Sequence, residues 1–200
     1  MHAIARLAPR FLVAGLLATL LAGCGVNDIP TYDEAVKAAW AQVDNQYKRR
    51  ADLIPNLVEV VKGYASHEKD TLTAVVEARA KATQMQIPSD ILSNPEAFQQ
   101  FQANQGALTQ ALSRLMVVVE RYPDLKANQN FLALQAQLEG TENRIAVARR
   151  DYIQAVQVYN TELRTFPGRI WAAILYSDMK PHETFTQPES VAEPPQVKFN

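Results

Sequence analysis

The chain has 200 residues with 20 basic and 21 acidic side chains, so its formal net charge is −1. This balance argues against nucleic acid as a partner, because binding to nucleic acid requires an excess of positive charge. A single cysteine excludes an intramolecular disulfide, so the packing of apolar side chains must stabilise the fold.

The N-terminal segment has the pattern of a bacterial secretory signal. Two arginines precede an apolar run at residues 11–22, and Leu21-Ala22-Gly23-Cys24 resembles a lipobox. The run is shorter than the roughly 20 apolar residues that a membrane-spanning helix needs. We therefore expect a lipoprotein signal peptide at 1–23 and attachment of lipid, including palmitate, to Cys24. An uncleaved anchor is the alternative.

The remaining chain divides by composition into three parts. Helical periodicity begins at Thr31, so residues 24–30 are expected to form a short lipidated tether. The pattern continues to residue 176, which predicts one helical domain over 31–176. From 177 to 200 the residues Pro, Glu, Gln, Thr and Ser predominate, a composition typical of a disordered tail.

The first helical region covers residues 31–83. Its apolar side chains recur at spacings of three, four and seven, which places them on one stripe of a helix. Pro55 interrupts the region, and Asp52 is suited to cap a new helix with Pro55 in its first turn. We therefore expect a break or a sharp kink at residues 51–55, and a break would divide the region into two helices.

Two further helices are expected. Residues 87–95 are rich in Pro, Ser, Asp and Asn, which predicts a turn. Helical periodicity then covers 95–121 and, after a tight connection at 122–124, covers 124–164. Four helices joined in this way predict an all-α fold, an elongated antiparallel four-helix bundle with packing like that of a coiled coil.

Four charged residues fall on the apolar stripes of these helices, namely Arg50, Glu68, Glu142 and Arg149. A buried charge requires a partner, so we expect cross-helix pairs that fix the register of the helices. The alternative is a catalytic use of the carboxylates, which would need a cleft and shifted pKa values.

Sequence motifs of catalysis and metal binding are absent. His67 and His182, the histidines that follow the signal segment, lack the partners of the H-E-x-x-H and E-x-x-H metal motifs. A nucleophile elbow and a phosphate-binding glycine loop are also missing. We therefore expect no cofactor, no metal site and no enzymatic activity.

Residues 169–176 form a short apolar segment that contains Ile170, Trp171 and Ile174. Three interpretations are open: the segment caps the end of the bundle, enters the membrane interface, or binds a partner. In the tail, Val197 and Phe199 alternate in a way that suits strand addition to the sheet edge of a partner.

Several long stretches resemble the LemA family. They are KRRADLIPNLV at 48–58, VKGYA at 61–65, HEK at 67–69, FLALQ at 131–135 and LEGTENRIAVARR at 138–150, with Tyr159-Asn160, Phe166-Pro167 and the final Pro-x-Val-x-Phe. The resemblance implies an all-α four-helix bundle at a bacterial membrane, without catalytic residues to transfer. Many members resemble integral membrane proteins, whereas this chain offers a lipobox. By analogy with lipoprotein sorting, Gly25 favours the outer membrane, facing the periplasm.

These features predict a membrane-anchored helical scaffold or adaptor lipoprotein of the bacterial cell envelope. Its expected partners are the membrane, through the lipid on Cys24, and an envelope protein. A small-molecule or lipid-binding bundle is the main alternative, and an enzyme that uses the stripe carboxylates is a further one. A pocket that gathers Glu68, Glu142 or Arg149 would overturn the scaffold prediction, whereas pairing of these charges across a dry seam without a cavity would weaken both alternatives.

Overall fold

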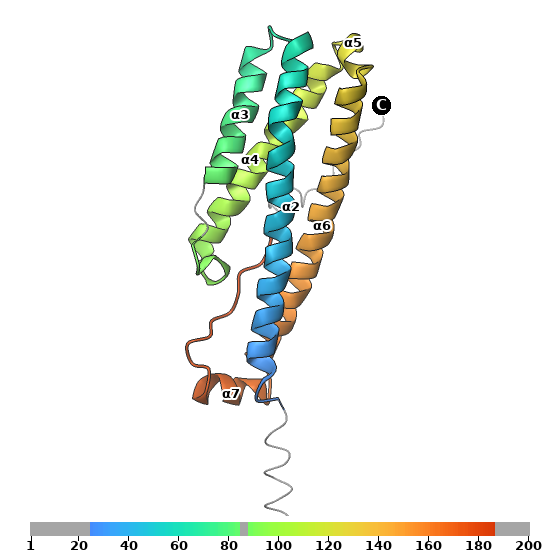
Figure 1. Ribbon diagram of the computed structural model, residues 1–200. Coiled ribbons are helices and arrows are strands. Elements are labelled where there is room, and N and C mark those ends of the chain that lie inside the picture. The colour runs from blue at the N-terminus through green and yellow to red at the C-terminus, as the bar shows by residue number, and fades with distance from the viewer. Residues whose placement is uncertain (1–24, 85–87, 187–200) are drawn as a thin grey trace, which may run out of the picture. The chain divides into compact units, whose positions relative to one another are not determined.

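The computed structural model describes residues 25–84 and 88–186. Over these residues the chain forms six α-helices and one short 3-10 helix, and it forms no strand (Figure 1). The signal segment, Cys24, Val197 and Phe199 lie outside the described residues. The expectations about them therefore stay predictions.

The described residues form two compact units. The first unit comprises residues 25–38 and 154–182, and the second comprises residues 39–153 and 183–186 around the undescribed positions 85–87. Helices α2 (Asp28–Tyr64) and α6 (Gln129–Glu162) contribute residues to both units.

Helix α2 begins at Asp28, ahead of the expected start at Thr31. Asp28 places a carboxylate in the first turn, where it interacts favourably with the helix dipole. Pro30 is tolerated in this turn, because a backbone N–H there would have no partner within the helix. Ile29 is fully buried, so the tether expected over 24–30 is too long: residues 28–30 already belong to the helix.

Pro55 lies inside α2, and the helix continues through residues 51–55. The expected division into two helices at this point is therefore wrong. Proline lacks the N–H that would bind the carbonyl four residues earlier, which is that of Ala51. Arg79 of α3 (Lys69–Gln84) replaces this donor, because its Nε donates a 2.8 Å hydrogen bond to the Ala51 oxygen.

The chain turns instead at residues 65–68, between α2 and α3. Gly63 lowers the helix propensity near the end of α2, and the apolar stripe has a gap before Leu72. Ala65 is fully buried in the turn, and its carbonyl accepts a hydrogen bond from the Glu68 N–H. The region therefore holds two helices, with their junction after Tyr64.

Helix α4 (Pro95–Val119) begins where the sequence predicts it. Asn94 caps the helix, because its Oδ1 accepts a 3.2 Å hydrogen bond from the Ala97 N–H, and Pro95 occupies the first turn. The expected turn before α4 contains the short 3-10 helix η1 (Ile91–Ser93).

Helix α6 begins at Gln129 and not at the expected residue 124. The sequence around Pro123 does start a helix, α5 (Pro123–Lys126), but α5 ends after one turn. Asn128 then caps α6, since its Oδ1 accepts hydrogen bonds from the N–H groups of Asn130 and Phe131. The Asn128 cap, which was not recognised from the sequence, therefore separates α5 from α6.

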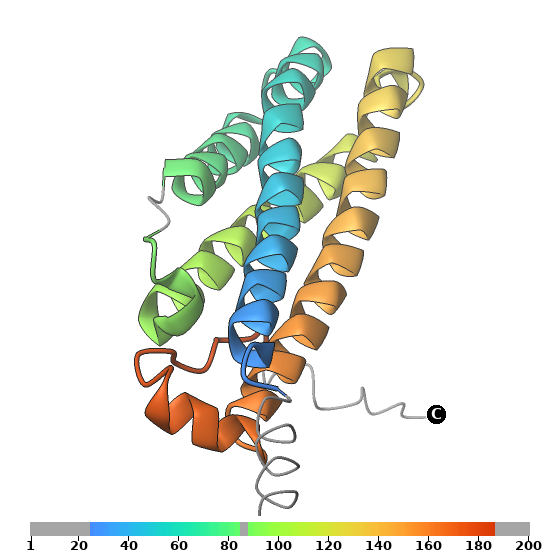
Figure 2. The same ribbon diagram turned by 60° about the horizontal axis from the view of Figure 1, so that its bottom comes forward.

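Helices α3 and α4 pack against each other in the second unit, and the parts of α2 and α6 in this unit run beside them (Figures 1 and 2). Aliphatic side chains from these helices form one buried core. An aromatic cluster adds ring contacts with centroids 5.1–6.3 Å apart. The cluster consists of Trp40, Phe98, Phe101, Tyr152 and Phe185.

The expectation of a disordered tail is wrong for residues 177–186, which the structure describes. In the first unit, the Asn160 amide both donates to the His182 carbonyl and accepts from the His182 N–H, each at 2.9 Å. In the second unit, the Tyr152 hydroxyl donates to the Glu183 carbonyl at 2.7 Å, and Phe185 is buried. The amino-acid composition of the tail reveals neither these side-chain hydrogen bonds nor the burial of Phe185.

Candidate functional site

Arg50 lies at the centre of a polar network in the second unit. Its side chain is only 1 % exposed, although guanidinium groups usually stay in water. Nη1 donates to Thr109 Oγ1 at 3.0 Å and to Glu142 Oε1 at 2.9 Å. Nη2 donates to Gln105 Oε1 at 2.6 Å. One side chain of α2 thereby joins α4 and α6.

This network combines hydrogen bonds with one ion pair. The guanidinium also lies over the Tyr47 ring, 5.0 Å from its centroid, which adds a cation–π contact. Burial raises the pKa of Tyr47, and the nearby Arg149 and Arg50 charges partly offset that effect. Because a shifted helix would leave the buried charge unpaired, the network favours one register of the three helices.

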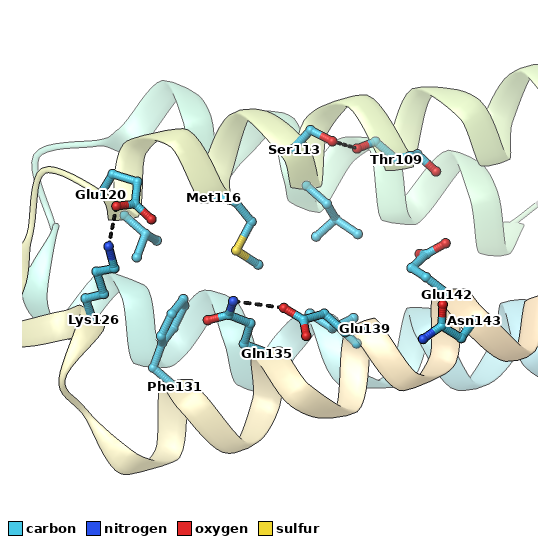
Figure 3. A pocket seen from close by; sticks show the side chains of 13 residues that line it. Thr109, Ser113, Met116, Glu120, Lys126, Phe131, Gln135, Glu139, Glu142 and Asn143 are labelled. Atoms are coloured by element: carbon cyan, nitrogen blue, oxygen red, sulfur yellow. Dashed lines mark hydrogen bonds and ion pairs between the residues drawn. The ribbon is translucent and has the colours of Figure 1, made fainter.

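A groove lies between α4 and α6, beside this network (Figure 3). Its volume is about 660 Å³. Apolar side chains form its floor, and in Figure 3 Met116 points into the space between the helices. The floor residues are Leu112, Met116, Val119, Phe131 and Leu138.

The rim of the groove is polar, and several of its side chains are already paired. Lys126 binds Glu120, Gln135 donates to Glu139 at 2.9 Å, and Ser113 donates to the Thr109 carbonyl at 2.9 Å (Figure 3). An apolar floor with a polar rim suits an amphipathic helix or an apolar ligand.

A second hollow, of about 640 Å³, gathers Arg50, Glu142 and Arg149. The Glu142 carboxylate accepts its hydrogen bond from Arg50. The Arg149 guanidinium lies over the Phe185 ring, 4.3 Å from its centroid. The sequence therefore identified three charges that the fold brings together, but it did not identify the aromatic contact of Arg149.

Glu68 lies elsewhere in the second unit, in the turn between α2 and α3. Its Oε1 accepts hydrogen bonds from Arg121 Nη2 and from the Tyr122 hydroxyl, both at 3.0 Å. The bond to Glu68 raises the pKa of the Tyr122 hydroxyl. Glu68 thus holds the turn against the segment that follows α4 and contributes nothing to either hollow.

The apolar segment after α6 forms the short helix α7 (Gly168–Ile174) in the first unit. Ile170 and Ile174 are exposed on it, whereas Trp171 is half-buried. The interpretation as a bundle cap requires these side chains to be buried, so the exposure of both isoleucines argues against it.

One cluster in the first unit was not identified from the sequence. His182 Nε2 lies 2.6 Å from Asp33 Oδ1, Lys37 Nζ lies 2.8 Å from Asp33 Oδ2, and the Tyr159 ring stacks on the imidazole. Burial disfavours the Asp33 carboxylate, but the hydrogen bonds from Lys37 and His182 outweigh it and lower the pKa of this carboxyl. Asp33 lies seven residues before Trp40, two turns along the same apolar stripe, and this spacing could have identified it as buried.

Within the described residues, no group of three or more His, Cys, Asp or Glu side chains is placed to hold a metal ion. The described helices are also too short or too polar to cross a bilayer.

The described chain is thus an all-helical protein in which a buried arginine joins three helices of one unit. It belongs to the LemA family, whose model matches residues 39–199. The names of the family and of the relatives that follow describe no catalysed reaction.

Curated relatives match most of this chain. Magnetosome protein MamQ 2 of Paramagnetospirillum magneticum is 29 % identical over 178 residues, which cover 81 % of this chain and 65 % of that protein. Protein LemA of Metamycoplasma hominis is 24 % identical over 140 residues, covering 70 % and 60 %. MamQ of Magnetospirillum gryphiswaldense is 26 % identical over 164 residues, covering 74 % and 60 %. The chain thus spans between 60 and 65 % of the length of these relatives.

Proposed function

We propose that this protein is a membrane-anchored helical scaffold or adaptor of the bacterial cell envelope. The anchor is the lipid on Cys24, after removal of residues 1–23, and the protein faces the periplasm from the outer membrane. Helices α2, α3, α4 and α6 act as an antiparallel four-helix bundle. The groove between α4 and α6 receives an amphipathic helix of an envelope protein.

The groove is the observation that carries the adaptor proposal. Its apolar floor offers contact area for the apolar side of a helix, and polar groups on its rim already satisfy one another. The Arg50 network beside it fixes the helices that form its walls. A rigid wall favours binding, because little conformational entropy is lost when the partner docks.

A second candidate function is the binding of a small apolar molecule or lipid in the same groove. The volume of about 660 Å³ favours it, since it falls within the range of roughly 300–1,000 Å³ that is typical of ligand pockets. The second hollow gathers Glu142 and Arg149 but not Glu68, so the outcome that counts against the scaffold is met in part. We rank small-molecule binding below the adaptor, because the Arg50 guanidinium already donates its hydrogen bonds to Glu142, Thr109 and Gln105 and is not available to a ligand. An enzyme that uses Glu68 and Glu142 ranks lower still, because Glu68 binds Arg121 and lines neither hollow.

The experiment uses full-length protein in intact bacteria that are fed an alkyne fatty acid. We expect the label on the wild type in the membrane fraction and no label on Cys24→Ala. Adding Val117→Cys to Cys24→Ala provides a control, since it restores a thiol at an exposed site without restoring the lipobox. A labelled Cys24→Ala variant would contradict lipid attachment at this residue.

In the same cells, a photo-crosslinker at Ser113 on the edge of the groove tests the adaptor proposal. We expect one discrete protein adduct, which Met116→Trp abolishes by filling the groove. The matched control is Val117→Trp, whose side chain is exposed on α4 and does not line the groove. If Met116→Trp instead removes a small molecule that copurifies with the wild type, the second candidate function replaces the adaptor.

A further inference from the structure

The first unit exposes a concentrated group of apolar side chains around α7. Phe166 is 83 % exposed, Ile170 45 %, Ile174 68 % and Leu175 54 %. We call these four residues the α7 patch. Soluble surfaces do expose single apolar side chains, but a group of large ones within one short segment marks an interaction surface.

The geometry of α7 keeps the patch outward. Ile170 and Ile174 are four residues apart and therefore lie on the same face of the helix. Trp171 is half-buried, and its indole Nε1 is buried without a hydrogen-bond partner among the described residues. The tryptophan anchors the helix while the isoleucines face away from the unit. At seven residues, α7 is far too short to cross a bilayer, which takes about 20 residues.

The chain enters this unit beside the patch. Gly25 follows Cys24 directly, and a Cβ atom added to Gly25 would lie 3.6 Å from Pro167 Cγ. Pro167 lies between Phe166 and α7. Figures 1 and 2 both show α7 next to the start of α2. Lipid attachment at Cys24, as proposed above, is therefore one residue along the chain from Gly25, which lies beside the patch.

The charges near the patch fit a phospholipid surface. Arg164 and Arg169 are exposed on either side of Phe166, and Asp178 is the exposed acidic residue that follows Leu175. The half-buried carboxylates of Glu162 and Asp28 lie beside Gly168 and Gly25, so the basic side chains are the more exposed charges next to Phe166 but are not in excess. Basic side chains next to exposed apolar ones are typical of segments that lie in the headgroup region, where they meet anionic phosphates.

We propose that the α7 patch docks into the surface of the bilayer to which the N-terminus of this chain is attached. The occupant of the patch is phospholipid, with the four apolar side chains among the upper acyl segments and both arginines among the headgroups. This inference rests on the membrane attachment in the proposed function and adds a second contact. Because a lipid anchor alone permits the domain to rotate freely, the second contact sets which side of the first unit faces the bilayer.

The test measures the depth of α7 in vesicles that contain only the purified, lipidated full-length protein. Lipidation blocks Cys24, so a cysteine introduced by Ile174→Cys is the one thiol that an environment-sensitive dye can label. The matched control is Val117→Cys, an apolar side chain of the second unit with 71 % exposure. We expect dye emission at 174 to shift to shorter wavelength and to be quenched several-fold more by brominated lipids than emission at 117.

The other outcomes separate the two proposals. If the protein sediments with the vesicles but the dye at 174 behaves like the dye at 117, the docking of α7 is wrong and the anchor stands. If the shift at 174 grows with protein density and brominated lipid does not quench it, a second copy covers the patch and the inference is overturned. If the protein does not associate with the vesicles at all, both the anchor and the docking fail.

Discussion

Arg50 shows how a single side chain couples three helices of the second unit. Burying a guanidinium is costly, and an opposite charge with further hydrogen-bond acceptors offsets much of that cost. The Nε of Arg50 is buried without a partner among the described residues, so its set of partners is not complete. Glu142 supplies the opposite charge, while Thr109 and Gln105 accept further hydrogen bonds. Arg50 therefore contributes more to the choice of one packing than to the total free energy of unfolding.

Replacing Arg50 tests this balance. We expect Arg50→Ala to lower the free energy of unfolding by about 2–4 kcal/mol, since it leaves Gln105 unpaired and opens a cavity. The value stays below that of a fully buried ion pair because the Glu142 side chain is 44 % exposed. Urea denaturation followed by circular dichroism gives the difference. Arg49→Ala is the matched control, because Arg49 is exposed, and equal stability of the two variants would contradict the role of Arg50.

Periodicity could identify the charges on the apolar stripes, but it could not assign their partners. Arg50 and Glu142 stand 92 positions apart, and their pairing depends on how α2 meets α6. Arg149 follows Glu142 by two turns of the same helix, yet its guanidinium lies over a ring from the far end of the chain. Of the four charges expected to be buried only Arg50 is, whereas Glu68, Glu142 and Arg149 are partly exposed. Burial and partner choice are both tertiary properties, so a single sequence indicates which charges lie on the stripes and neither how deeply they are buried nor what they bind.

At the scale of the element, α2 keeps a proline in its interior because α3 supplies a donor. Arg79→Met removes the hydrogen bond to the Ala51 carbonyl, which is buried, and we expect a loss of about 1–3 kcal/mol. In a Pro55→Ala background the restored N–H can bind that carbonyl, so the same change should cost about 1 kcal/mol less. Urea denaturation of the four proteins in this double-mutant cycle measures the coupling.

Lys81→Met is the control for the Arg79 substitution, because it removes a positive charge from an exposed position of the same helix. It should have little effect in either background. Equal losses for Arg79→Met with and without Pro55 would mean that the arginine stabilises α3 by packing alone.

The boundaries of the elements were predictable where a cap and a proline coincide, as at Asn94 and Pro95. They were not predictable where the deciding contact comes from another element. Pro55 suggested a helix break because the donor from Arg79 is invisible in local sequence. Asn128 was overlooked as a cap, because Pro123 already provided a plausible helix start only a few residues earlier.

At the scale of the whole molecule, the described fold ends later than composition indicates. A chain that stops after Ser177 loses Phe185 from the aromatic cluster and His182 from Asp33. We expect its melting temperature to lie on the order of 10 °C below that of a chain that stops after Thr186. Differential scanning calorimetry of both truncated proteins measures the difference, and equal values would show that residues 178–186 contribute no stability.

This comparison also decides how the tail should be tested for binding. Deleting residues 178–200 removes structural contacts together with Val197 and Phe199, so a lost partner would have two explanations. Truncation after Thr186 leaves the described contacts in place and removes both candidate binding residues. Only the second truncation tests strand addition by the end of the chain.

The helical class and the family could be predicted from the sequence, because long local patterns carry both. The packing of residues 177–186 could not, since it depends on hydroxyl and amide groups of α6 that bind backbone atoms of a proline-containing segment. Such contacts leave no periodic trace in the segment itself.

Pro55 also affects the axial register in which α3 packs against α2. By deleting one N–H, the proline leaves the Ala51 carbonyl in the interior of α2 without its intrahelical donor, and Arg79 is the donor that reaches it. Sliding α3 by one helical turn would move that donor by about 5.4 Å and leave the carbonyl unsatisfied. Pro55, the residue type that most disfavours a helix, therefore helps to set the position at which α3 packs along α2.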